Sequence, residues 1–289
     1  MYKPFFTGCC TALVTPFLDQ KVNYPMLEQL LQKQMLAGLD VALVCGTTGE
    51  SATLTDEEII EIVRRAKAYV GKQMRIIAGT GSNDTAHAVA LSKAAQDAGA
   101  DALLVVSPYY NKATPEGLVR HYLSIAHAVK IPIILYNVPA RTGVDIPVSV
   151  YRRLSAIANI IGVKEASGDI GKILRIRSAC PDTFTVWTGN DDLTVPAISL
   201  GASGVISVAG NVCPEEMQDM AMAALDGDFD TAASLQRQLL PLTDALFREV
   251  NPIPVKAAMK CIGYDCGGCR LPLTEAAAET LEILQQILT

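Results

Sequence analysis

Residues 160–169 read Ile-Ile-Gly-Val-Lys-Glu-Ala-Ser-Gly-Asp, the pattern of a buried strand that ends in a lysine. Its first four residues form a continuous apolar run, which is typical of a strand buried on both faces. Lys164 ends the strand and a turn follows. Burial destabilises the charged form of an amine, and the free base can attack a carbonyl to form a Schiff base. We therefore predict a lysine kept for chemistry, with an ion pair to a neighbouring carboxylate as the alternative.

Short apolar runs of this kind recur along the chain and alternate with amphipathic stretches. We predict strands over residues 8–14, 41–44, 75–78, 102–106, 133–136, 160–164, 184–188 and 204–208. We predict helices between them over residues 25–37, 56–70, 85–98, 115–129 and 147–156. Thr55 followed by Glu58 fits a capping box at the start of the second helix. A strand followed by a helix, repeated about eight times, favours a closed α/β barrel, the (β/α)8 TIM barrel.

The pattern changes after the last predicted strand. Residues 214–225, 229–246, 254–262 and 274–288 have helical periodicity, and no further strand pattern follows. We predict a catalytic barrel over residues 1–225 and a helical C-terminal domain over residues 226–289. The sequence contains no Gly/Ser linker or low-complexity tract, so we expect this extension to pack on the barrel.

Composition excludes several classes of function. The formal net charge is −6 and the basic residues are scattered singly, so we expect no nucleic-acid partner. No segment approaches about 18 unbroken apolar residues, and the first ten residues lack a signal-peptide pattern. We therefore expect a cytoplasmic protein that does not bind a membrane. Residues 79–83, Gly-Thr-Gly-Ser-Asn, lack the third glycine of a dinucleotide fingerprint, and no P-loop motif occurs.

Metal binding is also not expected. Asp191 and Asp192 could hold a divalent ion, but adjacent side chains diverge, and two acids more simply begin a helix. Eight cysteines in 289 residues are too dilute for a disulfide scaffold. The spacing of Cys261, Cys266 and Cys269 matches the start of a plant-type iron–sulfur ligand set, but no fourth ligand follows at a suitable spacing. An iron–sulfur module stays a remote alternative to ordinary thiols.

Three segments that follow predicted strands carry chemically useful groups, and a barrel gathers such segments at one face. Residues 46–51, Gly-Thr-Thr-Gly-Glu-Ser, offer hydroxyls and amides that can bind a carboxylate, or form a helix-capping turn. Tyr136 can relay a proton and Arg141 can bind a carboxylate bidentately. Taken alone, Tyr136 fits a core-edge tyrosine equally well, and Arg141 fits a surface ion pair slightly better. Tyr109 and Tyr110, in the third segment, serve packing or an intersubunit contact.

Seven motifs together make the chain resemble the dihydrodipicolinate synthase family over essentially its whole length. They are GTTGES at 46–51, SPYYNKATPEG at 107–117, YNVPARTG at 136–143, GVKEASGD at 162–169, GVISVAGN at 204–211, NPIPVKAAMK at 251–260 and RLPLT at 270–274. N-acetylneuraminate lyases and sugar-acid aldolases share the lysine and the pyruvate motif. Arg141 followed by Thr-Gly is typical of members that take aspartate semialdehyde, while Ala140 replaces a more usual Gly or Ser.

The resemblance implies a reaction. Lys164 would form an imine with pyruvate, whose carboxylate would be held by Thr47 and Thr48. The derived enamine would attack L-aspartate 4-semialdehyde, anchored by Arg141, and give 4-hydroxy-tetrahydrodipicolinate on the way to diaminopimelate and lysine. No cofactor is implied beyond the covalent imine.

The resemblance also implies supporting residues and an oligomer. Tyr136, Thr48 and Tyr110 would form a proton relay, with Tyr110 reaching in from a neighbouring subunit. A chain of hydroxyls suits this task because a phenol with an ordinary pKa near 10 transfers protons usefully only when hydrogen bonds tune it. Gly189 and Ile206 match positions whose carbonyls lie near the imine. We expect a homo-oligomer, a tetramer built from tight dimers.

Lysine-inhibited members of the family bind L-lysine at the tight-dimer interface, and this chain matches that site only in part. Asp56 and Ile59 replace histidines, and His87 stands where a glutamate would pair with the ammonium group of lysine. Loss of such a desolvated charge pair weakens binding by about two decades or more. We therefore predict little or no inhibition by L-lysine. The possible lysine-site positions are Ser51, Ala52, Asp56, Asn83, His87 and Tyr109.

Two further alternatives stay open beside the condensing enzyme. One is a related pyruvate-dependent lyase or aldolase that acts on a sugar acid. The other is a protein that binds a metabolite without catalysis, which the intact set of Lys164, Tyr136 and Thr48 argues against.

Overall fold

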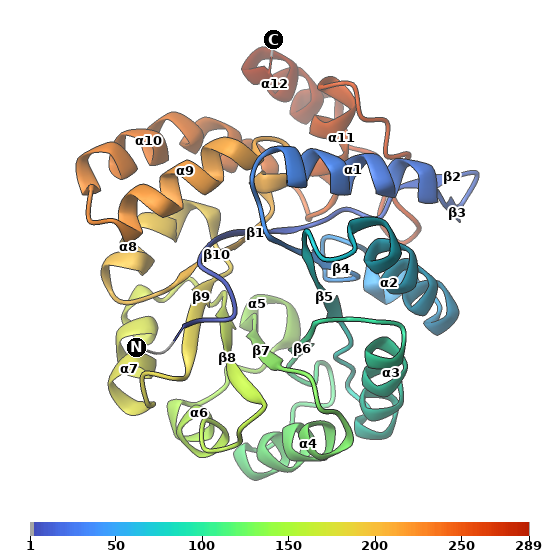
Figure 1. Cartoon of the computed structure of the whole chain (residues 1–289). Helices are drawn as coiled ribbons and strands as arrows, with labels where there is room; N and C mark the ends of the chain where they lie inside the picture. The colour runs from blue at the N-terminus through green and yellow to red at the C-terminus, as the bar shows by residue number, and fades with distance from the viewer. Residues whose placement is uncertain (1–2, 289) are drawn as a thin grey trace.

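Eight parallel strands close into a barrel in the computed structural model, which describes residues 3–288 (Figure 1). The order around the barrel is β1-β10-β9-β8-β7-β6-β5-β4, so each barrel strand lies beside the barrel strands before and after it in the sequence, and β10 closes the barrel against β1. The barrel strands are β1 Gly8–Ala12, β4 Val41–Val44, β5 Arg75–Gly79, β6 Ala102–Val106, β7 Ile133–Asn137, β8 Ile160–Glu165, β9 Thr185–Thr188 and β10 Gly204–Ser207. The predicted TIM barrel is confirmed. The short antiparallel pair β2 (Phe17–Leu18) and β3 (Lys21–Val22) was not predicted.

Helices surround the barrel as an outer ring (Figure 1). They are α1 Tyr24–Leu36, α2 Asp56–Val70, α3 Thr85–Asp97, α4 Pro115–Ala128, α6 Val148–Leu154, α7 Ile170–Ala179, α8 Thr194–Ser199 and α9 Pro214–Leu225. The short helix α5 Pro139–Thr142 directly follows β7 and lies inside this ring (Figure 1). The capping box at α2 is confirmed, because the Thr55 side chain accepts from the Glu58 N–H and the Glu58 carboxylate accepts from the Thr55 N–H. Sequence analysis did not single out α7 or α8. Helix α7 mixes basic residues into a ten-residue span, and α8 is only six residues long, so neither has a clear helical pattern.

The C-terminal extension consists of α10 (Phe229–Leu246), α11 (Ile253–Cys261) and α12 (Ala278–Leu288). As expected, it packs on the barrel, with α10 against α9 and α12 against both α10 and α11 (Figure 1). The predicted start of the last helix at residue 274 was wrong. The N–H of Ala277 donates to the Glu249 carboxylate at 3.0 Å, and the helix begins only after this contact. The domain boundary at residue 226 stays a prediction.

Two hydrophobic clusters fill the molecule. The outer one joins the strands to the helices, and the inner one fills the barrel. In the inner cluster Trp187 stacks on Phe6 with ring centroids 4.8 Å apart, and its indole N–H donates to the Phe6 carbonyl at 3.2 Å. Because Phe6 precedes β1, this aromatic pair fills the part of the barrel interior near the amino ends of the strands. Open space is left at the carboxyl ends.

The helices among residues 3–288 include none with the length and apolar character needed to span a membrane.

Candidate active site

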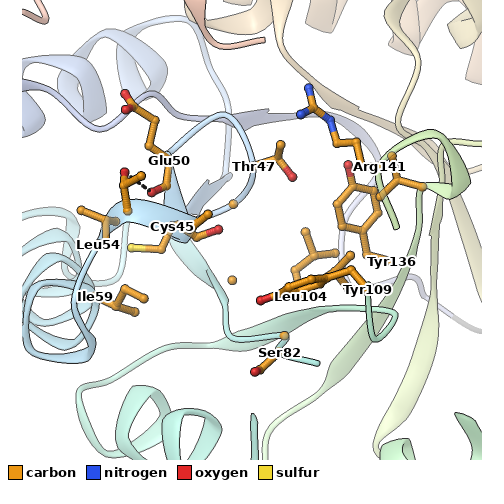
Figure 2. Close-up of a pocket in the computed structure, with 18 of the residues that line it drawn as sticks. Cys45, Thr47, Glu50, Leu54, Ile59, Ser82, Leu104, Tyr109, Tyr136 and Arg141 are labelled. Atoms are coloured by element: carbon orange, nitrogen blue, oxygen red, sulfur yellow. Dashed lines mark hydrogen bonds between the residues drawn. The ribbon is translucent and has the colours of Figure 1, made fainter. Parts of the chain in front are cut away.

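A cavity of about 450 Å³ opens at the carboxyl ends of β4 to β7. Predicted site residues from three separate segments line it: Thr47 after β4, Tyr136 at the end of β7, and Arg141 in α5. Figure 2 shows these three side chains together on one side of the cavity. The C-terminal extension adds Asn251 to the lining. The parallel strands of the barrel bring Thr47, Tyr136 and Arg141 to one face, and the extension adds Asn251 from about 200 residues after Thr47.

Lys164 lies beside Tyr136 because β7 and β8 pair in parallel with these two residues in register. The lysine is 5 % exposed, and its Nζ lies 4.6 Å from the centroid of the Tyr136 ring. Lys164 does not itself line the cavity. A Cβ added at Gly189 would lie 2.7 Å from both Lys164 Cε and Ala166 Cβ, so a larger residue there would displace its neighbours, the lysine side chain among them. Gly189 is thus close to the lysine, where the sequence analysis expected it.

The loop after β4 carries Thr47 and Thr48 in a tight, left-handed turn. Cys45 and Glu50 flank the pair with φ values of 54° and 57°, which non-glycine residues rarely adopt. The Glu50 N–H donates to the Thr47 carbonyl at 3.1 Å. The hydroxyl of Thr15 donates to the Gly49 carbonyl at 2.6 Å. Strain of this kind needs support from neighbouring structure.

That support comes from Glu50, whose carboxylate is held by the C-terminal extension. Lys256 of α11 pairs with Glu50 Oε1 at 2.5 Å, and the two side chains are 3 % and 1 % exposed. The N–H of Arg270 donates to Glu50 Oε2 at 2.8 Å. The thiol of Cys269 also hydrogen-bonds to Glu50, and burial together with this carboxylate raises the pKa of Cys269 to about 11. The loop that carries both threonines is therefore fixed by residues more than 200 positions later.

Sequence analysis missed these partners. Glu50, Lys256 and Arg270 each belong to a motif noted above, but only the motif was recognised and no role was assigned. A lysine within the apolar stretch of α11 was the available signal, because a buried lysine requires a partner.

Arg141 is exposed, as a substrate anchor at a cavity mouth can be. Its Nη2 donates to the main-chain carbonyl of Asn251 at 3.2 Å. The side-chain Nδ2 of Asn251 donates to Thr48 Oγ1 at 2.9 Å. Thr48 is buried, so one residue of the extension contacts both a predicted relay residue and the predicted anchor.

Two further predicted residues lie outside the cavity. Ile206, in β10, is fully buried in the inner cluster of the barrel. Tyr110 is 90 % exposed with a φ of 70° and, within the described chain 3–288, does not line the cavity. Its neighbour Tyr109 does line it. A tyrosine presented outward on a strained loop is compatible with a contact to another subunit.

The possible lysine-site positions extend the same cavity away from Tyr136. Asp56 and His87 form a pair there, with His87 Nε2 at 2.9 and 3.0 Å from the two carboxylate oxygens of Asp56. The other ring nitrogen of His87 contacts the Ser82 hydroxyl at 3.1 Å. Among the predicted positions, those that line the cavity are Ser51, Ala52, Asp56, His87 and Tyr109, and Asn83 does not.

Asp191 does not lie on the surface as an ordinary helix-starting acid would. It is 1 % exposed, and its Oδ2 accepts from the N–H groups of Val208 and Ala209 at 3.0 and 2.9 Å. Burial raises the pKa of this carboxyl, while the backbone donors and the Lys164 charge oppose that rise. Asp191 thereby ties the loop after β9 to the loop after β10, close to the lysine.

The cysteines of the C-terminal loop are thiols. Burial raises the pKa of Cys266 to about 12, and its carbonyl accepts from the Phe17 N–H at 2.9 Å. Across residues 3–288 there is no group of three or more His, Cys, Asp or Glu side chains able to hold a metal ion. Cys261, Cys266 and Cys269 thus do not gather as a ligand set.

The chain is a (β/α)8 barrel with a buried lysine at the carboxyl end of β8, and its relatives are aldolase-type lyases. The family model described as the dihydrodipicolinate synthetase family matches residues 5–289. The chain belongs to this family.

Individual relatives agree with the family match. The chain is 48 % identical over 288 residues to the 4-hydroxy-tetrahydrodipicolinate synthase of Acetivibrio thermocellus, covering 100 % of this chain and 98 % of the relative. It is 42 % identical to the dihydrodipicolinate synthase of Acinetobacter baumannii solved in complex with pyruvate, with a TM-score of 0.95 and coverage of 98 % and 97 %. The enzyme from Cyanidioschyzon merolae solved with lysine bound is 40 % identical, with a TM-score of 0.96 and coverage of 99 % and 98 %.

Replacement of Lys256 by methionine tests the buried ion pair between Lys256 and Glu50. Because the change leaves a carboxylate buried without its counter-charge, we expect Lys256→Met to lower the free energy of unfolding by about 3–5 kcal/mol. Lys260→Met is the matched control, since Lys260 is 72 % exposed and lies 3.8 Å from Asp265, and it should cost less than about 1 kcal/mol. Urea denaturation followed by circular dichroism measures both. Equal losses of unfolding free energy in the two variants would contradict a stabilising role for this ion pair.

Proposed function

We propose that the chain condenses pyruvate with L-aspartate 4-semialdehyde to give 4-hydroxy-tetrahydrodipicolinate through a Schiff base on Lys164. The observation that carries the proposal is the buried Lys164 in register with Tyr136 at the carboxyl end of β8. Relatives that the chain matches over nearly its full length bear the name of this enzyme. Nothing in the comparisons favours a sugar-acid lyase or a protein without catalysis.

In the proposed mechanism Lys164 Nζ attacks the keto carbon of pyruvate, and loss of water gives the imine. The Thr47 and Thr48 loop binds the pyruvate carboxylate through its amides and hydroxyls. The imine withdraws electrons, so a proton leaves the pyruvate methyl group and an enamine forms. The enamine carbon attacks the aldehyde of the second substrate. Cyclisation by the amine of that substrate expels the Lys164 amine and completes the turnover.

The other residues bind the second substrate or transfer protons. Arg141 binds the carboxylate of the semialdehyde, because guanidinium donors match a carboxylate bidentately. Tyr136, Thr48 and a Tyr110 from a neighbouring subunit relay protons between the reacting atoms. The carbonyls of Gly189 and Ile206 lie near the imine. This assignment makes an oligomer necessary for catalysis, and the tetramer and the cytoplasmic location stay predictions.

Borohydride trapping with pyruvate tests the imine directly. Reduction makes the bond irreversible, so we expect one reduced pyruvate per chain, located on Lys164 by peptide mass mapping. Lys164→Arg should abolish the adduct, whereas Lys260→Arg, an exposed lysine, should leave it unchanged. Full labelling of the Lys164→Arg variant would refute the assignment.

Arg141→Ala tests the second-substrate anchor. Charge-assisted hydrogen bonds contribute about 1.5–3 kcal/mol, so we expect kcat/KM for aspartate semialdehyde to fall about 10- to 100-fold. Pyruvate trapping by borohydride should keep its wild-type rate. Arg153→Ala removes an exposed arginine paired with Glu116 and serves as the control. A parallel loss of trapping in Arg141→Ala would argue against a selective anchor.

Feedback inhibition by L-lysine should be weak or absent. Both carboxylate oxygens of Asp56 lie within hydrogen-bond distance of His87 Nε2, so the ammonium of lysine would have to compete with the imidazole for them. We expect half-inhibition only above about 1 mM L-lysine in a steady-state assay. The exchange variant Asp56→His/His87→Glu should lower this concentration by about two decades. Half-inhibition of the unsubstituted chain at submillimolar lysine would contradict the prediction.

A further inference from the structure

Asn251 connects two parts of the site that belong to different steps of the reaction. It stands two residues before α11, next to the cap residue Pro252, and is 6 % exposed. Its side-chain amide donates to Thr48 and its main-chain carbonyl accepts from Arg141. Its Oδ1 is buried without a protein partner in the described chain. An unpaired buried oxygen costs about 1–3 kcal/mol, which is a poor arrangement for a residue that serves stability alone.

The direction of the bond to Thr48 determines what the hydroxyl can do. An amide N–H only donates, so Thr48 Oγ1 is the acceptor and its single proton is left for another partner. If residue 251 accepted instead, that proton would be consumed by the bond. The amide therefore turns the Thr48 hydroxyl into a donor directed away from the extension.

The main-chain carbonyl of Asn251 acts on Arg141. It uses one of the five N–H donors of the Arg141 guanidinium. The remaining donors are available for a carboxylate. A long exposed side chain loses much rotamer freedom when it binds, and a bond that holds it in place beforehand reduces that loss.

We propose that Asn251 is a positioning residue of the condensation, whose Nδ2 fixes the proton direction of Thr48 and whose carbonyl pre-orients Arg141. The proposal rests on the proposed function. The two contacts come from different atoms of the residue, and substitution of the side chain removes only the first.

Two substitutions separate this role from packing. Asn251→Ala removes the donor and keeps the carbonyl, so kcat should fall about 3- to 10-fold while KM for the semialdehyde stays within about threefold. Asn251→Asp keeps the shape but accepts the Thr48 proton, so its kcat should fall further, by about 10- to 100-fold. A residue that only packs would give the opposite order, because aspartate is the closer match in shape.

A Thr48→Val background separates proton direction from the added charge. If Asn251 acts through Thr48, the excess loss of Asn251→Asp over Asn251→Ala should disappear when the hydroxyl is absent. Asn159→Asp, which loses an equivalent amide donor at the other end of β8, should keep wild-type kcat. An aspartate variant as active as the alanine variant, or an excess loss that persists in Thr48→Val, would overturn the proposal. Turnover by the unsubstituted chain tests the proposed function separately.

Discussion

The buried ion pair between Glu50 and Lys256 is the interaction on which the site depends. It joins the loop after β4 to helix α11 across the face of the barrel, with both side chains almost fully buried. A buried pair of this kind contributes little net stability compared with apolar packing, but it has strict geometry. Here that geometry holds Glu50 in a left-handed conformation and thereby shapes the turn of Thr47 and Thr48. The C-terminal extension is thus part of the active site rather than an appendage.

Successive side chains of β8 point to opposite faces of the strand, so one strand can serve both chemistry and structure. Lys164 points toward Tyr136 inside the barrel, and Glu165 points the other way. The Glu165 carboxylate accepts from Asn137 Nδ2 at 3.0 and 3.1 Å and from the Ser167 N–H at 2.9 Å. These bonds tie the end of β8 to β7 and to the following turn. The position of the lysine is consequently supported by a network on the opposite face of its own strand.

Much of the architecture could be predicted from the sequence, because parallel barrel strands are continuously apolar and leave a clear signal. All eight strands and the position of the lysine at a strand end were recovered in this way. The Asp56 and His87 pair, the role of Glu50 and the two contacts of Asn251 could not be predicted. Each depends on side-chain geometry between segments 31 to 206 positions apart, and a residue pattern carries no information on such contacts. The late start of α12 has the same origin, since Glu249 captures the N–H of Ala277.

The dependence of the Thr47 and Thr48 turn on α11 has a consequence for how the enzyme is made. Chains are synthesised from the amino end, and barrel strands and the lysine leave the ribosome before residues 251–270. A nascent chain that has completed β10 therefore holds Lys164 but lacks Lys256, the cation that pairs with Glu50 in the turn of Thr47 and Thr48. The turn of Thr47 and Thr48 can therefore take its final shape only after α11 has been synthesised.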